Sequence, residues 1–134
     1  MAAATYLLYP ALTRIAPFVA GDTARLYSAF RAPSLAIATL ALGPVILGEE
    51  LVWRGVVQGA LTRRFGIGKG VAWTAGAYAL AHAPLASPTL VLVSLACGLA
   101  WGALRAATGS LVPTLVAHLI WDLLVLLWRP LISG

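Results

Sequence analysis

Long apolar runs that contain few charges constrain this chain more than any other feature. A helix needs about 20 mostly apolar residues to cross the hydrocarbon core of a bilayer. Four runs approach or reach that length, and a fifth is broken by two prolines and an arginine: 34–61, 70–83, 89–104 and 111–128, with 5–20 as the weaker one. The pattern predicts an all-α, polytopic transmembrane helix bundle with four to five spans.

The composition agrees with a lipid environment. Only 10% of the 134 residues are charged and 61% are hydrophobic, whereas a soluble domain carries about 25% charged residues. The basic residues are scattered, apart from the group Arg63, Arg64 and Lys69, so they form no nucleic-acid patch. Loop charges of this kind are typical of the cytoplasmic side of membrane proteins. We therefore expect the protein to lie in a lipid bilayer and to bind no nucleic acid.

The length allows one domain, which we divide into an N-terminal segment and a core. Residues 1–33 are expected to lie in the interface or to form a weak first span, and residues 34–134 form the membrane core. The start has no basic region, so no cleavable signal peptide is predicted. Short connections are expected at 62–69, at 84–88 and at 105–110, the last of which ends in a helix stop at Thr108-Gly109-Ser110. Helices joined so tightly pack antiparallel.

The few ionisable side chains fall inside the apolar runs. Three of the four acids, Glu49, Glu50 and Asp122, occur there, and so do both histidines, His82 and His118. The fourth acid, Asp22, is assigned to a loop. Because an ionisable group at the centre of a membrane helix costs about 3 kcal/mol, such groups are functional candidates. The pattern predicts a polar cavity between the helices.

Helical spacing suggests how these groups pair. Glu50 and Arg54 stand four residues apart, so their side chains meet and neutralise each other. Glu49 lies about 100° further round the helix and is left as a candidate general base. His118 and Asp122 form a second pair of this spacing. Pro44 removes one backbone hydrogen bond and is expected to kink the helix near these acids.

Three motifs in this order resemble those of the CPBP family, also called Abi, which includes type II CAAX prenyl endopeptidases and bacteriocin-processing proteins. They are Glu49-Glu50-x-x-x-Arg54, Tyr78-x-x-x-His82 and His118-x-x-x-Asp122. The resemblance covers residues 44–125. It implies an intramembrane endopeptidase of glutamic type, in a bacterial or archaeal cell membrane, that cleaves a membrane-associated protein or peptide.

The resemblance also implies a role for each motif residue. Glu49 would activate water and His82 would complete its polarisation, while His118 would donate to the oxyanion. Asp122 stands where some members have asparagine, so it either stays protonated and donates or orients the His118 ring. Glu50 and Arg54 would support the site through charge balance and the placement of Glu49 or substrate.

Other functions remain open. Histidines and acids at helical spacing can hold zinc, but the His-Glu-x-x-His arrangement of zinc proteases is absent, and no cofactor is expected. A non-catalytic immunity or binding protein could share the fold. A transporter is disfavoured because the chain has no inverted repeat. The sequence leaves the substrate's identity and the oligomeric state open.

Overall fold

The computed structural model describes residues 1–30 and 34–132, and over these ranges it contains helices and no strand. The elements follow in the order α1 (Ala2–Ile15), α2 (Phe18–Phe30), α3 (Leu35–Glu50), η1 (Leu51–Val57), α4 (Gln58–Phe65), α5 (Ile67–Ala81), η2 (Ala83–Leu85), α6 (Pro88–Thr108), α7 (Val112–Asp122) and η3 (Leu123–Trp128). The predicted all-α class is confirmed.

Within the described residues, two helices are long and apolar enough to cross a bilayer. The elements α3, η1 and α4 form one continuous helix of 31 residues, Leu35–Phe65, and α6 has 21 residues. The apolar helix Val112–Trp128 is shorter. With 14 and 13 residues, α1 and α2 extend only about 20 Å each, which is less than the ~30 Å of a hydrocarbon core. The number of four to five spans stays a prediction.

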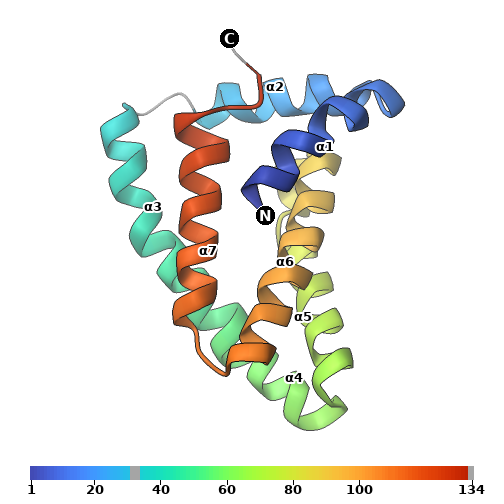
Figure 1. Ribbon diagram of the computed structural model, residues 1–134, viewed down its shortest axis with the longest axis vertical. Helices are drawn as coiled ribbons and strands as arrows, with labels where there is room; N and C mark the ends of the chain where they lie inside the picture. The colour runs from blue at the N-terminus through green and yellow to red at the C-terminus, as the bar shows by residue number, and fades with distance from the viewer. Residues whose placement is uncertain (31–33, 133–134) are drawn as a thin grey trace.

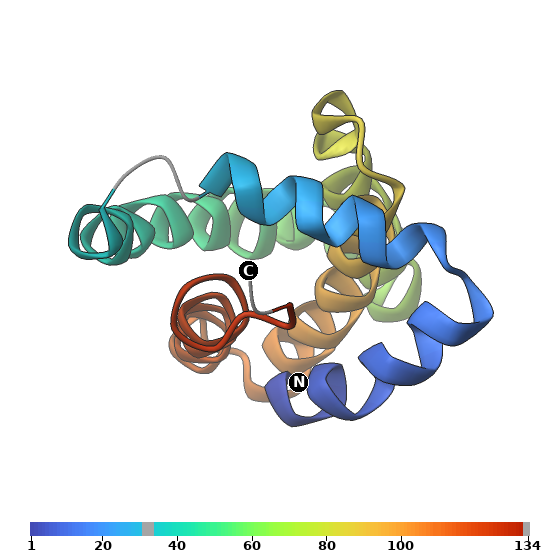
Figure 2. The same cartoon turned by 90° about the horizontal axis from the view of Figure 1, so that it is seen from above.

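The longer helices stand side by side, and the two N-terminal helices close one end of them. In Figure 1, α3, α5, α6 and α7 run upright, and α2 lies across their upper end. Seen from above in Figure 2, α2 crosses over the bundle, while α1 lies to one side of it. Helix α7 packs against α3 and α6, and α5 packs against α4 and α6. This arrangement places the polar motifs on helices that share neighbours.

Glycines determine where the helices end. A single residue, Gly66 with φ +83°, separates α4 from α5, so the predicted loop over 62–69 is wrong. A positive φ costs glycine little, and one such residue therefore suffices to end one helix and start the next. Gly109, with φ +67°, ends α6 at the predicted stop. A Cβ on Gly98 would lie 3.0 Å from the Cα of Ala75, so α5 and α6 approach each other closely at this glycine.

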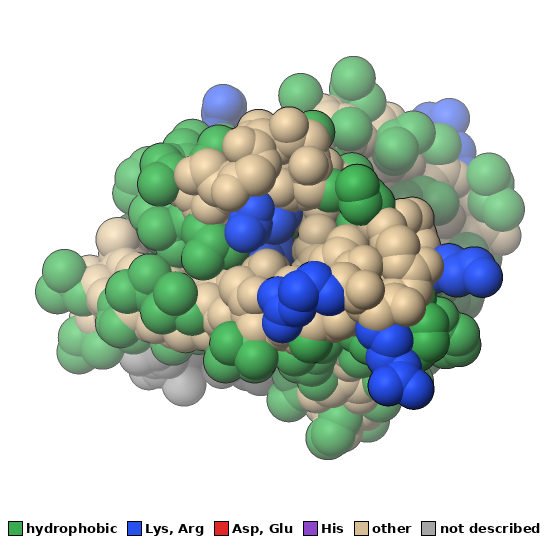
Figure 3. Space-filling model, turned by 90° about the horizontal axis from the view of Figure 1, so that it is seen from below, with side chains coloured by type: hydrophobic (Ala, Val, Ile, Leu, Met, Phe, Trp, Pro, Cys, Tyr) green, Lys and Arg blue, Asp and Glu red, His purple; other side chains and the backbone are tan. Residues whose placement is uncertain are grey.

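Charges gather at the two ends of the bundle. Arg63, Arg64 and Lys69 are exposed around the junction of α4 and α5. Figure 3 shows basic side chains over this end, which is opposite α2. Asp22 lies at the other end of the bundle. It is a residue of helix α2 and its side chain is buried, so its assignment to a loop is wrong. Its burial is possible because hydrogen bonds from α6 and the preceding turn satisfy the carboxylate.

Candidate functional site

Two π-helical segments begin directly after acidic residues. The first, η1, starts after Glu50, and the second, η3, starts after Asp122. The kink predicted at Pro44 does not coincide with them, because Pro44 lies inside α3 and the irregular hydrogen bonding starts at Leu51. Such segments are frequent at functional sites because they change the direction of neighbouring side chains. Both therefore mark the region where the motif residues meet.

The predicted pair of Glu50 and Arg54 is confirmed. Arg54 Nη1 lies 3.1 Å from Glu50 Oε1, and each side chain is only 1% exposed. The Arg54 guanidinium also stacks over the Tyr78 ring, 4.5 Å from its centroid, and lies 5.3 Å from the centroid of Trp101. These aromatic faces stabilise a cation that is shielded from water.

His118 joins this pair from the opposite helix. Its Nδ1 lies 2.9 Å from Glu50 Oε1. Because the carboxylate accepts, Nδ1 carries the proton and donates it, and this bond sets the orientation of the ring. The ring also stacks on Trp101 at a centroid distance of 3.8 Å and an interplanar angle of 23°. Glu50 therefore links α3 to α7 and holds His118 in one orientation.

The other ring nitrogen of His118 faces two further carboxylates. Nε2 lies 3.9 Å from Glu49 Oε2 and 3.7 Å from Asp122 Oδ2. The same Glu49 oxygen accepts a hydrogen bond of 2.9 Å from the Tyr78 hydroxyl. The Glu49 side chain is 30% exposed, whereas that of Glu50 is 1% exposed. Of the two adjacent glutamates, only Glu49 is open to an incoming molecule.

His82 lies beside this group instead of within it. Its Nδ1 donates to the Tyr78 carbonyl oxygen over 2.8 Å, and its ring meets the Tyr78 ring edge-on at 4.7 Å. Among the described residues, His82 makes no hydrogen bond or ion pair with Glu49. The structure thus brings together five of the six predicted residues, Glu49, Glu50, Arg54, His118 and Asp122, and connects His82 to them through Tyr78.

Two aromatic residues contribute contacts that sequence reasoning did not assign. Trp101 is stacked on His118, and Tyr78 donates to Glu49. Trp101 stands in an apolar run where a tryptophan is most often a core residue, so the sequence contained no signal for its contact. Tyr78 begins the motif that ends at His82, and its hydroxyl, which phenylalanine would lack, was the available signal.

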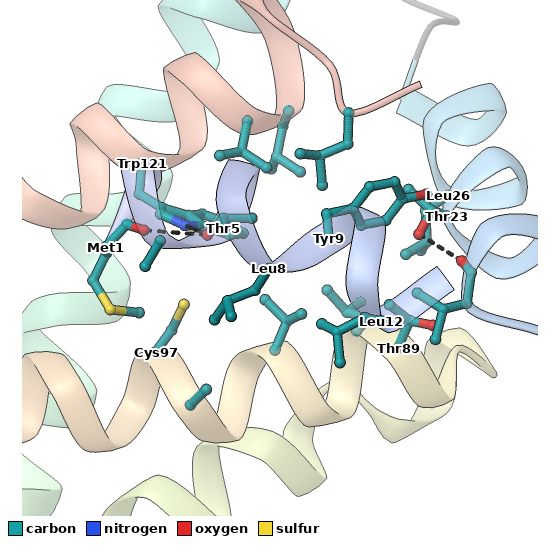
Figure 4. A pocket seen from close by; sticks show the side chains of 18 of the residues that line it. Met1, Thr5, Leu8, Tyr9, Leu12, Thr23, Leu26, Thr89, Cys97 and Trp121 are labelled. Atoms are coloured by element: carbon teal, nitrogen blue, oxygen red, sulfur yellow. Dashed lines mark hydrogen bonds between the residues drawn. The ribbon is translucent and has the colours of Figure 1, made fainter. Parts of the chain in front are cut away.

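The predicted polar cavity stays a prediction. An apolar cavity of about 330 Å³ lies beside the polar residues, between α1, α2, α6 and the C-terminal residues. Figure 4 shows this cavity with mostly apolar walls. Trp121, the neighbour of Asp122, belongs to its lining.

The arrangement offers general acid-base groups and few metal ligands. Within residues 1–30 and 34–132, no three His, Cys, Asp or Glu side chains are grouped so that they could hold a metal ion. A carboxylate that is open to water, next to a histidine whose free nitrogen points toward it, is a typical arrangement for proton transfer.

The comparison with known families agrees with these positions. The family described as Rce1-like, type II CAAX prenyl endopeptidase Rce1-like, matches residues 30–124, which include all three motifs. No curated protein and no solved structure matches the chain. The matched region covers well over half of the chain and all of the polar cluster. The chain therefore belongs to the Rce1-like family of type II CAAX prenyl endopeptidases, which are membrane-embedded peptidases.

Proposed function

We propose that this membrane endopeptidase is of the glutamic type and that Glu49 is its general base. The observation that carries the proposal is the contrast between the adjacent glutamates. Glu50 is buried and bonded to Arg54 and His118, whereas Glu49 is 30% exposed and has one oxygen near His118 Nε2. An exposed carboxylate can take a proton from water, and a buried, paired one cannot do so without breaking its contacts.

In the proposed reaction, water attacks the carbonyl carbon of the scissile peptide and gives its proton to Glu49. His82 assists from the other side of the water. Its Nδ1 is occupied by the Tyr78 carbonyl, so Nε2 is the nitrogen left for the water. The tetrahedral intermediate then collapses, and the proton held by Glu49 passes to the leaving amine.

His118 is proposed to stabilise the oxyanion. Its Nδ1–H is committed to Glu50, so only Nε2 can donate to substrate, and it does so when the ring carries both protons. The carboxylates of Glu49, Glu50 and Asp122 each lie within 4 Å of a ring nitrogen. Glu50 is thus a positioning residue, and Asp122 supports the charge on the ring. The orienting bond that the family resemblance left to Asp122 is assigned here to Glu50.

The proposed substrate is a membrane-associated protein or peptide, consistent with the family description. The test uses the protein reconstituted in vesicles together with isotope-labelled membrane extracts, in which new protein termini are detected by mass spectrometry. The wild-type protein should generate termini that Glu49→Gln does not. If neither protein generates any terminus while both retain the same bound partner, the chain is a non-catalytic binding protein.

A test with a chelator addresses the remaining alternative, a zinc-dependent membrane protease. Activity should survive a chelator, because water activation is assigned to Glu49 and His82. Zinc bound in stoichiometric amount, lost together with activity and restored with it, would assign water activation to a metal ion.

A further inference from the structure

Tyr78 contacts three of the predicted site groups, each through a different part of the residue. Its hydroxyl donates a hydrogen bond of 2.9 Å to Glu49 Oε2, and the face of its ring lies 4.5 Å from the Arg54 guanidinium. Its backbone carbonyl oxygen accepts the hydrogen bond of 2.8 Å from His82 Nδ1. Tyr78 is only 4% exposed, so almost none of its surface is open to substrate or water. Any effect of Tyr78 on the reaction must therefore pass through the groups that it contacts.

The hydroxyl of Tyr78 is held in place by the packing of its ring. The Trp53 ring meets the Tyr78 ring edge-on at a centroid distance of 5.5 Å, and the His82 ring does so at 4.7 Å. Arg54 covers one face of the ring. Because neighbours from both η1 and the end of α5 surround the ring, the hydroxyl is a fixed donor. The half-buried Glu49 side chain is the more mobile partner of this hydrogen bond.

The hydrogen bond distinguishes the two oxygens of the Glu49 carboxylate. Oε2 accepts from the Tyr78 hydroxyl and lies 3.9 Å from His118 Nε2. Among the described residues, Oε1 takes part in no hydrogen bond or ion pair. A general base must hold its accepting atom at hydrogen-bond distance from the proton that it removes. Oε1 is the oxygen whose lone pairs remain available for that proton.

Tyr78 also connects the two groups that flank the water in the proposed reaction. Glu49 is bonded to the Tyr78 hydroxyl and His82 to the Tyr78 carbonyl oxygen, while the two make no hydrogen bond with each other in the described part of the chain. A displacement of a reacting group by about 1 Å can lower a rate about 10²-fold. A residue that fixes both groups therefore affects the rate without touching the substrate.

We propose that Tyr78 is a positioning residue for the cleavage reaction. Its hydroxyl holds Glu49 Oε2 in place, and Glu49 Oε1 takes the proton from water. The hydroxyl keeps its own proton throughout. This inference rests on the proposed role of Glu49 as the general base, so its tests include Glu49→Gln beside the Tyr78 variant.

The first experiment compares Tyr78→Phe with the parent in the full chain reconstituted in vesicles. Phenylalanine keeps the ring and the backbone carbonyl, so the change removes only the hydroxyl. The probe is a synthetic peptide that spans a terminus generated by the wild-type protein in membrane extracts. The value of kcat should fall about 10- to 10²-fold, as for the loss of one hydrogen bond to a charged group, while KM stays within about twofold.

Tyr27→Phe is the matched control. The Tyr27 hydroxyl is also buried, and it donates to the Val125 carbonyl oxygen at 2.6 Å and accepts from Leu131 N at 3.1 Å. These bonds lie at the α2 end of the bundle, away from the polar cluster. Tyr27→Phe should lower the temperature of thermal unfolding and leave kcat of the folded protein unchanged.

A second measurement needs no substrate. The glutamates of the chain are Glu49 and Glu50, so labelling with ¹³Cδ-glutamate gives two side-chain NMR signals, which Glu49→Gln assigns. Tyr78→Phe should shift the Glu49 signal and leave that of Glu50 in place. Tyr27→Phe should shift neither signal.

Several results would overturn the inference. If Tyr78→Phe keeps the kcat of the parent while Glu49→Gln is inactive, the hydroxyl is only structural and Glu49 remains the base. A rise in KM at unchanged kcat would assign Tyr78 to substrate binding, and an unshifted Glu49 signal would show that the hydrogen bond is not formed. A Glu49→Gln variant that cleaves at the parent rate would remove the proposed base, and the role of Tyr78 with it.

Discussion

Carboxylates are buried in two regions of the molecule, and the two regions differ in how completely the carboxylates are hydrogen-bonded. At the α2 end, Asp22 accepts hydrogen bonds from Ser87 Oγ at 2.6 Å, from Thr89 N at 2.9 Å and from Arg25. In the polar cluster, Glu50 Oε2 and the nitrogens of Arg54 have no hydrogen-bond partner among the described residues, although the two side chains form an ion pair. A fully satisfied carboxylate is typical of a structural contact, and a crowded, partly satisfied group of acids is typical of a reactive site.

The largest expected effect is a loss of activity, which should occur on changing the polar cluster and not on changing the Asp22 region. Glu49→Gln removes the proposed base, so the rate of peptide cleavage should fall about 10²- to 10⁴-fold. Its stability should stay close to that of the parent, because Glu49 is partly exposed and its Tyr78 contact can be made to an amide oxygen. Reconstituted protein assayed for cleavage and thermal unfolding in detergent provides both readouts. If Glu49→Gln cleaves at the parent rate, the base lies elsewhere.

The next effect concerns stability inside the cluster. Glu50→Ala and Arg54→Ala each leave a buried charge without its partner, and each should lower the free energy of unfolding by about 3–5 kcal/mol. Replacing both by apolar residues, as in Glu50→Leu with Arg54→Met, should cost less than either single change. Unfolding in denaturant measures all three. Single variants that unfold like the parent would show that the pair contributes no stability.

Asp122 gives a smaller effect on activity. Asp122→Ala removes one of the carboxylates around the proposed His118 cation and should reduce the cleavage rate about 10²-fold, the lower end of the range for one oxyanion donor. Asp122→Asn should keep substantial activity because its amide can donate to the oxyanion directly. Should Asp122→Ala cleave as fast as the parent while His118→Ala is inactive, Asp122 is only a buried structural residue.

The sequence predicted the polar cluster better than it predicted the ends of the molecule. Helical spacing found the Glu50–Arg54 pair, and the position of acids and histidines inside apolar runs found the cluster. The bond from His118 to Glu50 joins residues 68 positions apart and required knowledge of how α3 and α7 pack. The π-helical segments left no sequence signal, since they depend on tertiary packing. Asp22 was misassigned because a carboxylate that is satisfied by another helix looks like a loop residue when only local charge is read.

The last and smallest effect concerns the stability that the buried Asp22 carboxylate contributes. Burial by itself raises the pKa of Asp22, but hydrogen bonds from Ser87, Arg25 and Thr89 outweigh it, so the pKa lies below its usual range. A group with a lowered pKa in the folded state stabilises the fold above its ordinary pKa of about 3.9, and this contribution is lost as the pH falls further. Asp22→Asn should therefore cost about 1.5–3 kcal/mol near neutral pH, as for hydrogen bonds to a charged group, and progressively less below pH 4.

The partners of Asp22 should follow in a fixed order. Ser87→Ala should cost less than Asp22→Asn, and Arg25→Gln should cost least, because the Arg25 side chain is 66% exposed and its ion pair is screened by solvent. Unfolding measured at pH 7 and at pH 3.5 gives the order and its pH dependence, while cleavage by the folded fraction should match the parent in all three variants. A variant of Asp22 that folds like the parent but does not cleave would place this end of the molecule in the reaction, and satisfied hydrogen bonds would no longer distinguish a structural carboxylate from a reactive one.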